Sequence, residues 1–147
     1  RQVYEAMAPK WSERYSVALS GGDWLVFGLA RSGVKVSQKY YDTYYNNVEA
    51  AVREKNGVLS ERKYTEYSRT VLALTAIGKD PASVAGYDLL KPLADFEQVA
   101  KQGINGTIFA LLALDSGKYE IPENPDAAVQ ATRQMYVDGN CRTAAGR

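Results

Sequence analysis

The fold class follows from an apolar stretch in the middle of the chain, which reads Tyr67-Ser68-Arg69-Thr70-Val71-Leu72-Ala73-Leu74-Thr75-Ala76-Ile77-Gly78. Its apolar residues cover most of a helical circumference, which indicates a helix that is buried on several sides. Gly78 suits the left-handed backbone position just past a helix end, and Pro81 follows soon after. The stretch therefore predicts a short buried helix that stops at Gly78.

Two further apolar stretches repeat this design, one on each side of the middle one. They cover residues 23–33 and 108–117, and they also end in glycines, Gly33 and Gly117. Asp23 is placed to cap the amino end of the first helix. The three stop glycines recur about every 40 residues, a period typical of helical-hairpin repeats.

Amphipathic stretches alternate with the apolar ones, each with apolar residues at i, i+4, i+7 and i+11. These residues are Tyr41, Tyr45, Val48 and Val52 in the first stretch and Leu89, Leu93, Phe96 and Ala100 in the second. A leading helix with a break is expected over 1–20, and another helix from Asn124 to about Tyr136. We expect an all-α fold of αα-hairpin repeats, with the apolar helices inside and the amphipathic ones outside.

Composition limits what the chain can bind or catalyse. Lys and Arg total 18 against 17 Asp and Glu, so net charge does not direct the chain to nucleic acid. No apolar run is long enough to cross a membrane. The chain has no histidine, which removes the usual general base and every His-containing zinc site. Cys141 has no residue near it in the sequence that could act as a base and activate its thiol. On these grounds we assign no catalytic residue, metal or cofactor.

Several strings of the chain together resemble a known superfamily. They are Gly21-Gly22-Asp23-Trp24, Leu29-Ala30-Arg31-Ser32-Gly33, Lys63-Tyr64-Thr65-Glu66-Tyr67-Ser68-Arg69, residues 72–81, and Gln102-Gly103-Ile104-Asn105-Gly106 leading into residues 109–115. These strings are similar to the αα-toroid superfamily of terpenoid cyclases and protein prenyltransferase β-subunits, most closely its bacterial surface-protein branch. The resemblance implies that the chain is an α/α partial toroid, about half of a ring.

The predicted organisation is a single αα-repeat domain over 1–147, as part of a longer protein. Its toroid repeats span 21–138, and a small, polar, flexible tail follows over 139–147. A half ring exposes an apolar edge, which predicts a homodimer or docking with the missing half of the ring.

The family's catalytic motifs do not occur in this sequence. It has no Asp-x-Asp-Asp acid motif, no His for a prenyltransferase zinc site and no Gly-Cys-Gly-Glu-Gln thioester string. We therefore predict a non-catalytic binding or scaffold module that takes a small molecule or a protein. The resemblance implies a larger, secreted or cell-surface bacterial protein. The alternatives are a terpenoid cyclase- or prenyltransferase-like enzyme completed by missing sequence or a partner chain, and a corrinoid binder like transcobalamin.

Four residues near the amino ends of the apolar helices are the candidate ligand contacts. Glu66 and Arg69 share a helix face, although a local ion pair between them is the simpler interpretation. Gln102 and Asn105 bring two amides to the start of the third apolar helix, where two glycines would let a ligand approach the backbone. The simpler interpretation there is a tight turn with Asn105 as N-cap.

Other conspicuous side chains have structural interpretations. Tyr41 and Tyr45 are expected to pack inside, which leaves Tyr40 and Tyr44 nearer the surface. We assign Trp24 to packing between helices. The carboxylates Asp80 and Asp115 lie beside the stop glycines, and we expect capping or turn roles for them.

Overall fold

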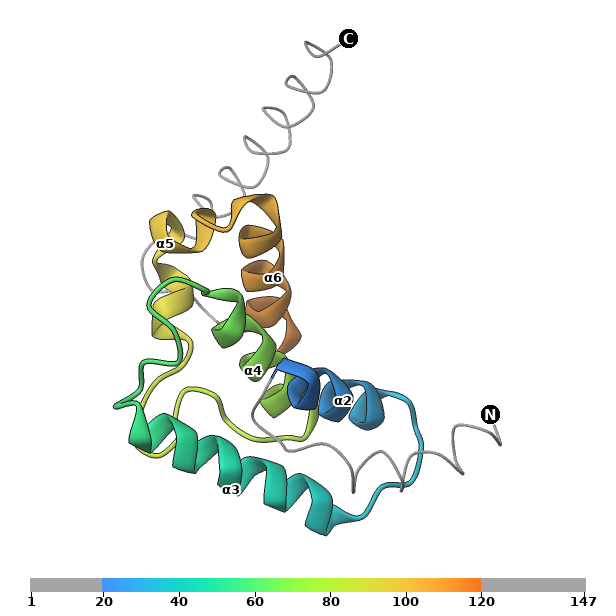
Figure 1. Cartoon of the computed structure of the whole chain (residues 1–147). Helices are drawn as coiled ribbons and strands as arrows, with labels where there is room; N and C mark the ends of the chain where they lie inside the picture. Colours follow the sequence, from blue (N-terminus) through green and yellow to red (C-terminus); the bar gives the residue numbers. More distant parts are fainter. Residues whose placement is uncertain (1–19, 120–147) are drawn as a thin grey trace, which may run out of the picture.

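The structure is a computed structural model that describes residues 20–119, and it shows an all-α fold there (Figure 1). The elements in chain order are α2 (Ser20–Arg31), α3 (Gln38–Glu54), α4 (Thr65–Ala76), the 3-10 helix η1 (Lys91–Ala94), α5 (Phe96–Ala100) and α6 (Gly103–Ser116). These residues form no strand, only an isolated antiparallel bridge between Val84 and Tyr87. The predicted all-α class is confirmed for this part, and the toroid and its repeats stay predictions. The helices predicted before residue 20 and from Asn124 onward lie outside the described residues, as does the tail.

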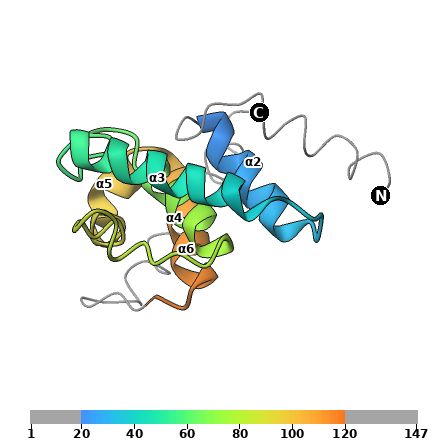
Figure 2. The same cartoon turned by 90° about the horizontal axis from the view of Figure 1, so that it is seen from below.

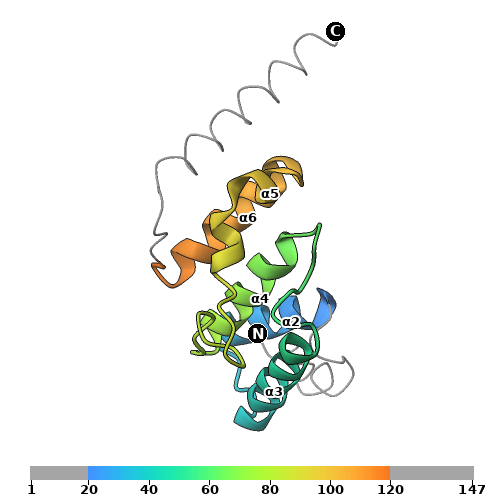
Figure 3. The same ribbon diagram turned by 90° about the vertical axis from the view of Figure 1, so that its left-hand side faces the viewer.

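Helix α4 lies at the centre of the fold. It packs against α2 and against α6, while α3 lies on another side of it and crosses it in the view from below (Figures 2 and 3). Four successive residues of α4, from Val71 to Leu74, are buried. The prediction of a helix buried on several sides therefore holds for α4, because neighbours cover most of its circumference.

Helix α6 is more apolar than α4 but is less well covered. Ile108 and Leu112 are 40% and 50% exposed, whereas Ala110 and Ala113 are fully buried. Within the described residues α6 packs on α4 and α5, which leaves one apolar face open. The expected place of this helix in the inner, buried row holds for the face that packs on α4 and α5 and not for the opposite face.

The first amphipathic helix is confirmed as α3, but its buried stripe is shifted. The buried side chains are Tyr44, Val48 and Val52, which follow one another at intervals of four residues. Tyr41 and Tyr45 are only partly buried, so the prediction that Tyr44 lies nearer the surface is wrong. The reason is a polar contact of Tyr44 with α2 that helical periodicity does not reveal.

The second amphipathic stretch forms two short helices, not one long helix. Pro92, in the first turn of η1, lacks the backbone N–H that a continuous helix would use. The Asp95 carboxylate accepts a hydrogen bond from the backbone N–H of Gln98 at 3.1 Å and so caps α5. Leu89, Leu93 and Val99 nevertheless bury their side chains completely.

The predicted helix ends agree with the structure at two of three places. Gly33 and Gly78 follow their helices with φ of 71° and 74°, the left-handed backbone expected there. Gly117 instead has φ of −117°, and the left-handed residue is Lys118 with φ of 54°. The Tyr119 ring lies against Gly117, where it would collide with a Cβ atom, and its hydroxyl lies 2.9 Å from the Thr75 hydroxyl of α4.

Replacing Leu74 by alanine tests the central position of α4. Leu74 is fully buried, so Leu74→Ala is expected to lower the free energy of unfolding by about 2–5 kcal/mol in urea titrations. Val58 is 48% exposed, and Val58→Ala should change that free energy by less than about 0.5 kcal/mol. Equal small effects of both substitutions would contradict the assignment of α4 to the core.

Candidate functional site

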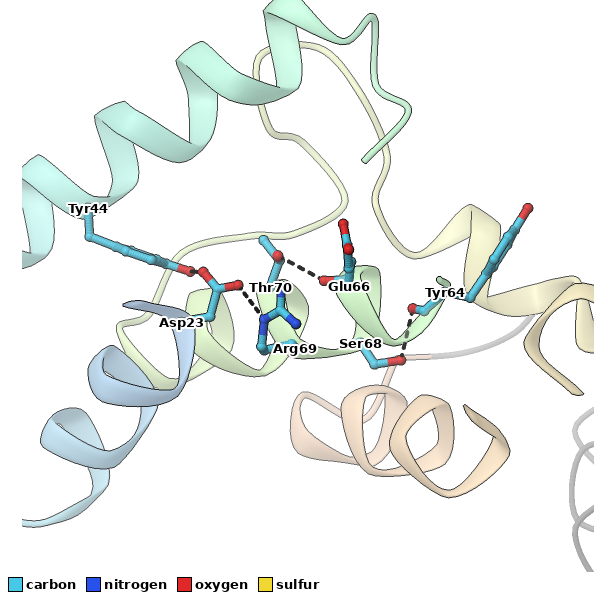
Figure 4. Close-up of polar contacts among 7 residues, drawn as sticks. All are labelled: Asp23, Tyr44, Tyr64, Glu66, Ser68, Arg69 and Thr70. Atoms are coloured by element: carbon cyan, nitrogen blue, oxygen red, sulfur yellow. Dashed lines mark hydrogen bonds and ion pairs between the residues drawn. The ribbon is translucent and has the colours of Figure 1, made fainter. Parts of the chain in front are cut away.

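A buried carboxylate, Asp23, joins three helices. Asp23 is 2% exposed; its Oδ1 accepts a hydrogen bond from the Tyr44 hydroxyl at 2.8 Å, and its Oδ2 accepts one from Arg69 Nε at 2.7 Å. Figure 4 shows this carboxylate of α2 between Tyr44 from α3 and Arg69 from α4. Because α2 begins at Ser20, Asp23 lies inside the helix, and its predicted N-cap role is wrong.

Glu66 and Arg69 lie near one another, but they do not form the predicted local ion pair. Arg69 pairs with Asp23, so the interpretation as a local ion pair is wrong. The two side chains do share a face, because both line a small pocket beside Asp23 and Lys55. Its volume of about 40 Å³ leaves room for no more than a few water molecules.

Gln102 anchors the start of one helix to the start of another. Its Oε1 accepts a hydrogen bond from the Thr65 backbone N–H at 2.8 Å, and its Nε2 donates to the Thr65 hydroxyl at 3.2 Å. These bonds satisfy a free N–H in the first turn of α4. Gln102 is also the N-cap position of α6, so Asn105 is not the N-cap but an exposed residue of the first turn.

Of the two glycines that follow Gln102, Gly106 does not open the backbone to a ligand. Gly106 is buried, and a Cβ atom there would collide with the Val99 carbonyl oxygen of α5. Its lack of a side chain therefore permits close packing of α5 on α6. The structure thus brings Glu66 and Arg69 to one small pocket and places Gln102 at the amino end of α4 and Asn105 on the surface of α6.

A larger pocket lies between α2, α4 and α6, and its volume is about 380 Å³. Its apolar lining consists of Trp24, Phe27, Leu72, Ala76, Phe109 and Leu112, and its polar lining of Arg31, Thr75, Asp115 and Ser116. We call it the three-helix pocket. Periodicity along the chain does not reveal this pocket, although it predicts the apolar helices that form its walls.

Aromatic rings form one part of the three-helix pocket. The Trp24 ring packs against Phe27 with centroids 6.1 Å apart in an edge-on arrangement, and against Phe109 at 5.6 Å. Trp24 thus packs between helices as predicted, yet it stays 42% exposed at the pocket. An exposed tryptophan beside two other rings offers a surface on which a flat apolar molecule can stack.

Of the two carboxylates beside stop glycines, one has the predicted role. The Asp80 Oδ1 accepts a hydrogen bond from the Ala82 backbone N–H at 2.9 Å, which confirms a turn role. The Asp115 carboxylate caps nothing within the described residues and lies exposed at the three-helix pocket. The sequence shows that Asp115 lies near the end of a helix. It does not show that residues of α2 and α4 line the same pocket.

Burial controls the ionisation of the tyrosines of α3. Desolvation and the nearby Asp23 carboxylate raise the pKa of Tyr44 far above the ordinary tyrosine value. Desolvation also raises the pKa of Tyr40 and of Tyr41. The folded protein therefore favours the neutral phenol at these positions.

Comparisons with protein-family models, with curated proteins and with solved structures find no significant match. Within residues 20–119, no group of three or more His, Cys, Asp or Glu side chains could hold a metal ion. No helix in the same range has the length and hydropathy needed to span a membrane.

Removing the Asp23 carboxylate tests its role in joining the helices. Asp23→Ala leaves the partly buried Arg69 guanidinium and the buried Tyr44 hydroxyl without their partner, so the free energy of unfolding should fall by about 3 kcal/mol. The matched control is Asp42→Ala, because the exposed Asp42 accepts a side-chain hydrogen bond from Gln38 on the same helix and from no other residue in 20–119. Its loss should stay below about 1 kcal/mol. Similar losses for both variants in urea titrations would refute the role of Asp23.

The raised pKa of Tyr44 predicts a loss of stability in alkali. The unfolded chain releases the phenol proton at the ordinary pKa of 10.0, whereas the folded chain retains it. Stability is therefore complete below that pH and falls above it, by up to about 1.4 kcal/mol per pH unit for this one group. Tyr44→Phe should flatten this decline in urea titrations between about pH 9 and 11. An unchanged slope would mean that Tyr44 ionises normally in the folded protein.

Proposed function

We propose that this chain is a non-catalytic binding module and that it holds a small apolar molecule in the three-helix pocket. The observation that carries the proposal is the pocket itself, with a volume of about 380 Å³ and an aromatic lining. Small-molecule sites are concave, mostly apolar and about 300–1,000 Å³ in volume, with a few polar groups. The three-helix pocket has each of these properties.

The exposed apolar surface of the pocket supplies the driving force for binding. Trp24 is 42% exposed and Leu112 is 50% exposed, and both line the pocket. A ligand that covers these side chains removes apolar surface from water, which contributes about 25 cal/mol for each Å². The preformed rings also need little rearrangement when a ligand enters.

The resemblance to αα-toroids supports a binding role and gives it a context. In such a ring the apolar helices face the centre, and α2, α4 and α6 are the helices that the sequence places on the inside. The proposed context is a partial toroid within a larger, secreted or cell-surface bacterial protein. A second copy or the missing half of the ring would then close the pocket from the open side.

An enzyme of the cyclase or prenyltransferase kind is the less favoured proposal. It shares the need for an apolar pocket, but its chemistry requires acidic side chains that protonate the substrate or hold a metal. Among the described lining residues Asp115 is the one acid, and it lies at the exposed rim. The pocket therefore favours binding over catalysis.

Filling the pocket tests the proposed function. The probe is 2-(1-naphthyl)ethanol, a neutral apolar molecule, and its saturable binding is followed by ligand-observed NMR. Leu112→Trp and Ala76→Phe place bulk at the pocket and should each weaken binding by about tenfold or more. Val58→Trp adds the same bulk at a residue that is 48% exposed and does not line the pocket, so it should leave binding unchanged.

Two outcomes would overturn the proposal. One is the absence of saturable binding to the unsubstituted chain. The other is equal binding by the unsubstituted chain and both filling variants, with helical content confirmed for all by circular dichroism.

A further inference from the structure

The three-helix pocket has two unlike ends. Trp24 and Phe109 supply rings toward the amino-terminal halves of α2 and α6. At the other end lie Arg31, Ala76 and Ser116, which are the last residues of α2, α4 and α6. Three helices therefore end at one side of the same pocket.

The helix ends give this side of the pocket a negative bias. Each helix carboxyl end carries a partial negative charge of about half an elementary charge, because its last carbonyl groups lack helical partners. Asp115 adds a full negative charge at the end of α6. Arg31 is the one cation among the lining residues that the structure describes. It closes α2, where a basic side chain offsets the dipole of its own helix.

Asp115 is poorly placed for the stability of α6 alone. A carboxylate near the negative end of a helix is unfavourable, and Asp115 has no ion pair with another described residue. A cation bound in the pocket would reverse this effect, since it would pair with Asp115 and face the ends of α4 and α6. The rings of Trp24 and Phe109 lie toward the other end of the pocket and offer a stacking surface for an aromatic group joined to that cation.

From this arrangement we propose that the ligand of the three-helix pocket is an aromatic amine. Its ring stacks on Trp24 and Phe109, and its ammonium group pairs with Asp115 at the end where the helices finish. This inference rests on the proposed function, because it names the class of molecule that occupies the same pocket.

The test compares three ligands with one ring system and different polar groups. They are 2-(1-naphthyl)ethylamine, 2-(1-naphthyl)ethanol and 1-naphthylacetate, which are positive, neutral and negative at neutral pH. The expected order of affinity is amine, then alcohol, then carboxylate, with the amine about fivefold tighter than the alcohol at low salt. Added salt should narrow the difference, because the pocket is open to solvent.

Two charge variants identify the residues that set this order. Asp115→Asn should remove the preference for the amine over the alcohol, measured as the ratio of the two affinities. Arg31→Gln should increase the affinity for the amine, since it removes the opposing positive charge. Asp42→Asn is the matched control, because it removes an exposed carboxylate on α3 that does not line the pocket.

The outcomes separate this inference from the proposed function. If the carboxylate binds as tightly as the amine, or if Asp115→Asn leaves the preference intact, the aromatic amine is the wrong ligand class and the apolar pocket stands. If none of the three ligands binds, the proposed function itself fails.

Discussion

The carboxylate of Asp23 is the constraint on which the rest of the structure depends. It is buried, so its charge must be compensated inside the protein, and Arg69 and Tyr44 provide that compensation from two other helices. Each bond has a narrow range of lengths and angles. The contact therefore sets the rotation of α3 about its axis and the position of α2 along α4. Removing the side chain of Tyr44 or Arg69 leaves one oxygen of the Asp23 carboxylate without its hydrogen bond. Removing Asp23 leaves both other side chains without theirs.

Helix α4 transmits this constraint to the remainder of the fold. Its middle holds α2 through Arg69, while Thr65 at its amino end holds the start of α6 through the amide of Gln102. The Thr75 hydroxyl near its carboxyl end contacts Tyr119, which follows α6. Helices α2 and α6 are thereby held on α4 with a space between them. The three-helix pocket is a consequence of how these polar anchors position helices whose facing surfaces are apolar.

The pocket and the small cavity beside Asp23 differ in a way that matters for function. In the small cavity the Asp23 carboxylate is paired with Arg69 and the remaining volume is about 40 Å³, which suits a structural role. In the three-helix pocket the charges of Arg31 and Asp115 are exposed and the apolar side chains are incompletely covered. A few polar groups beside open apolar surface are typical of a small-molecule site, because a ligand can satisfy both at once.

The sequence by itself determined what depends on neighbours along the chain. Continuous apolar residues within a helical period identify α4 and α6, and Gly33 and Gly78 mark helix ends because few other residues adopt positive φ without strain. Only the tertiary structure decided which tyrosine of α3 is buried, since that depends on a carboxylate of α2. It also decided the partner of Arg69, which lies 46 residues away. The three-helix pocket is likewise a feature that only the tertiary structure decides, because its lining residues come from three helices. Periodicity along one helix carries no information about which side chains of another helix will face it.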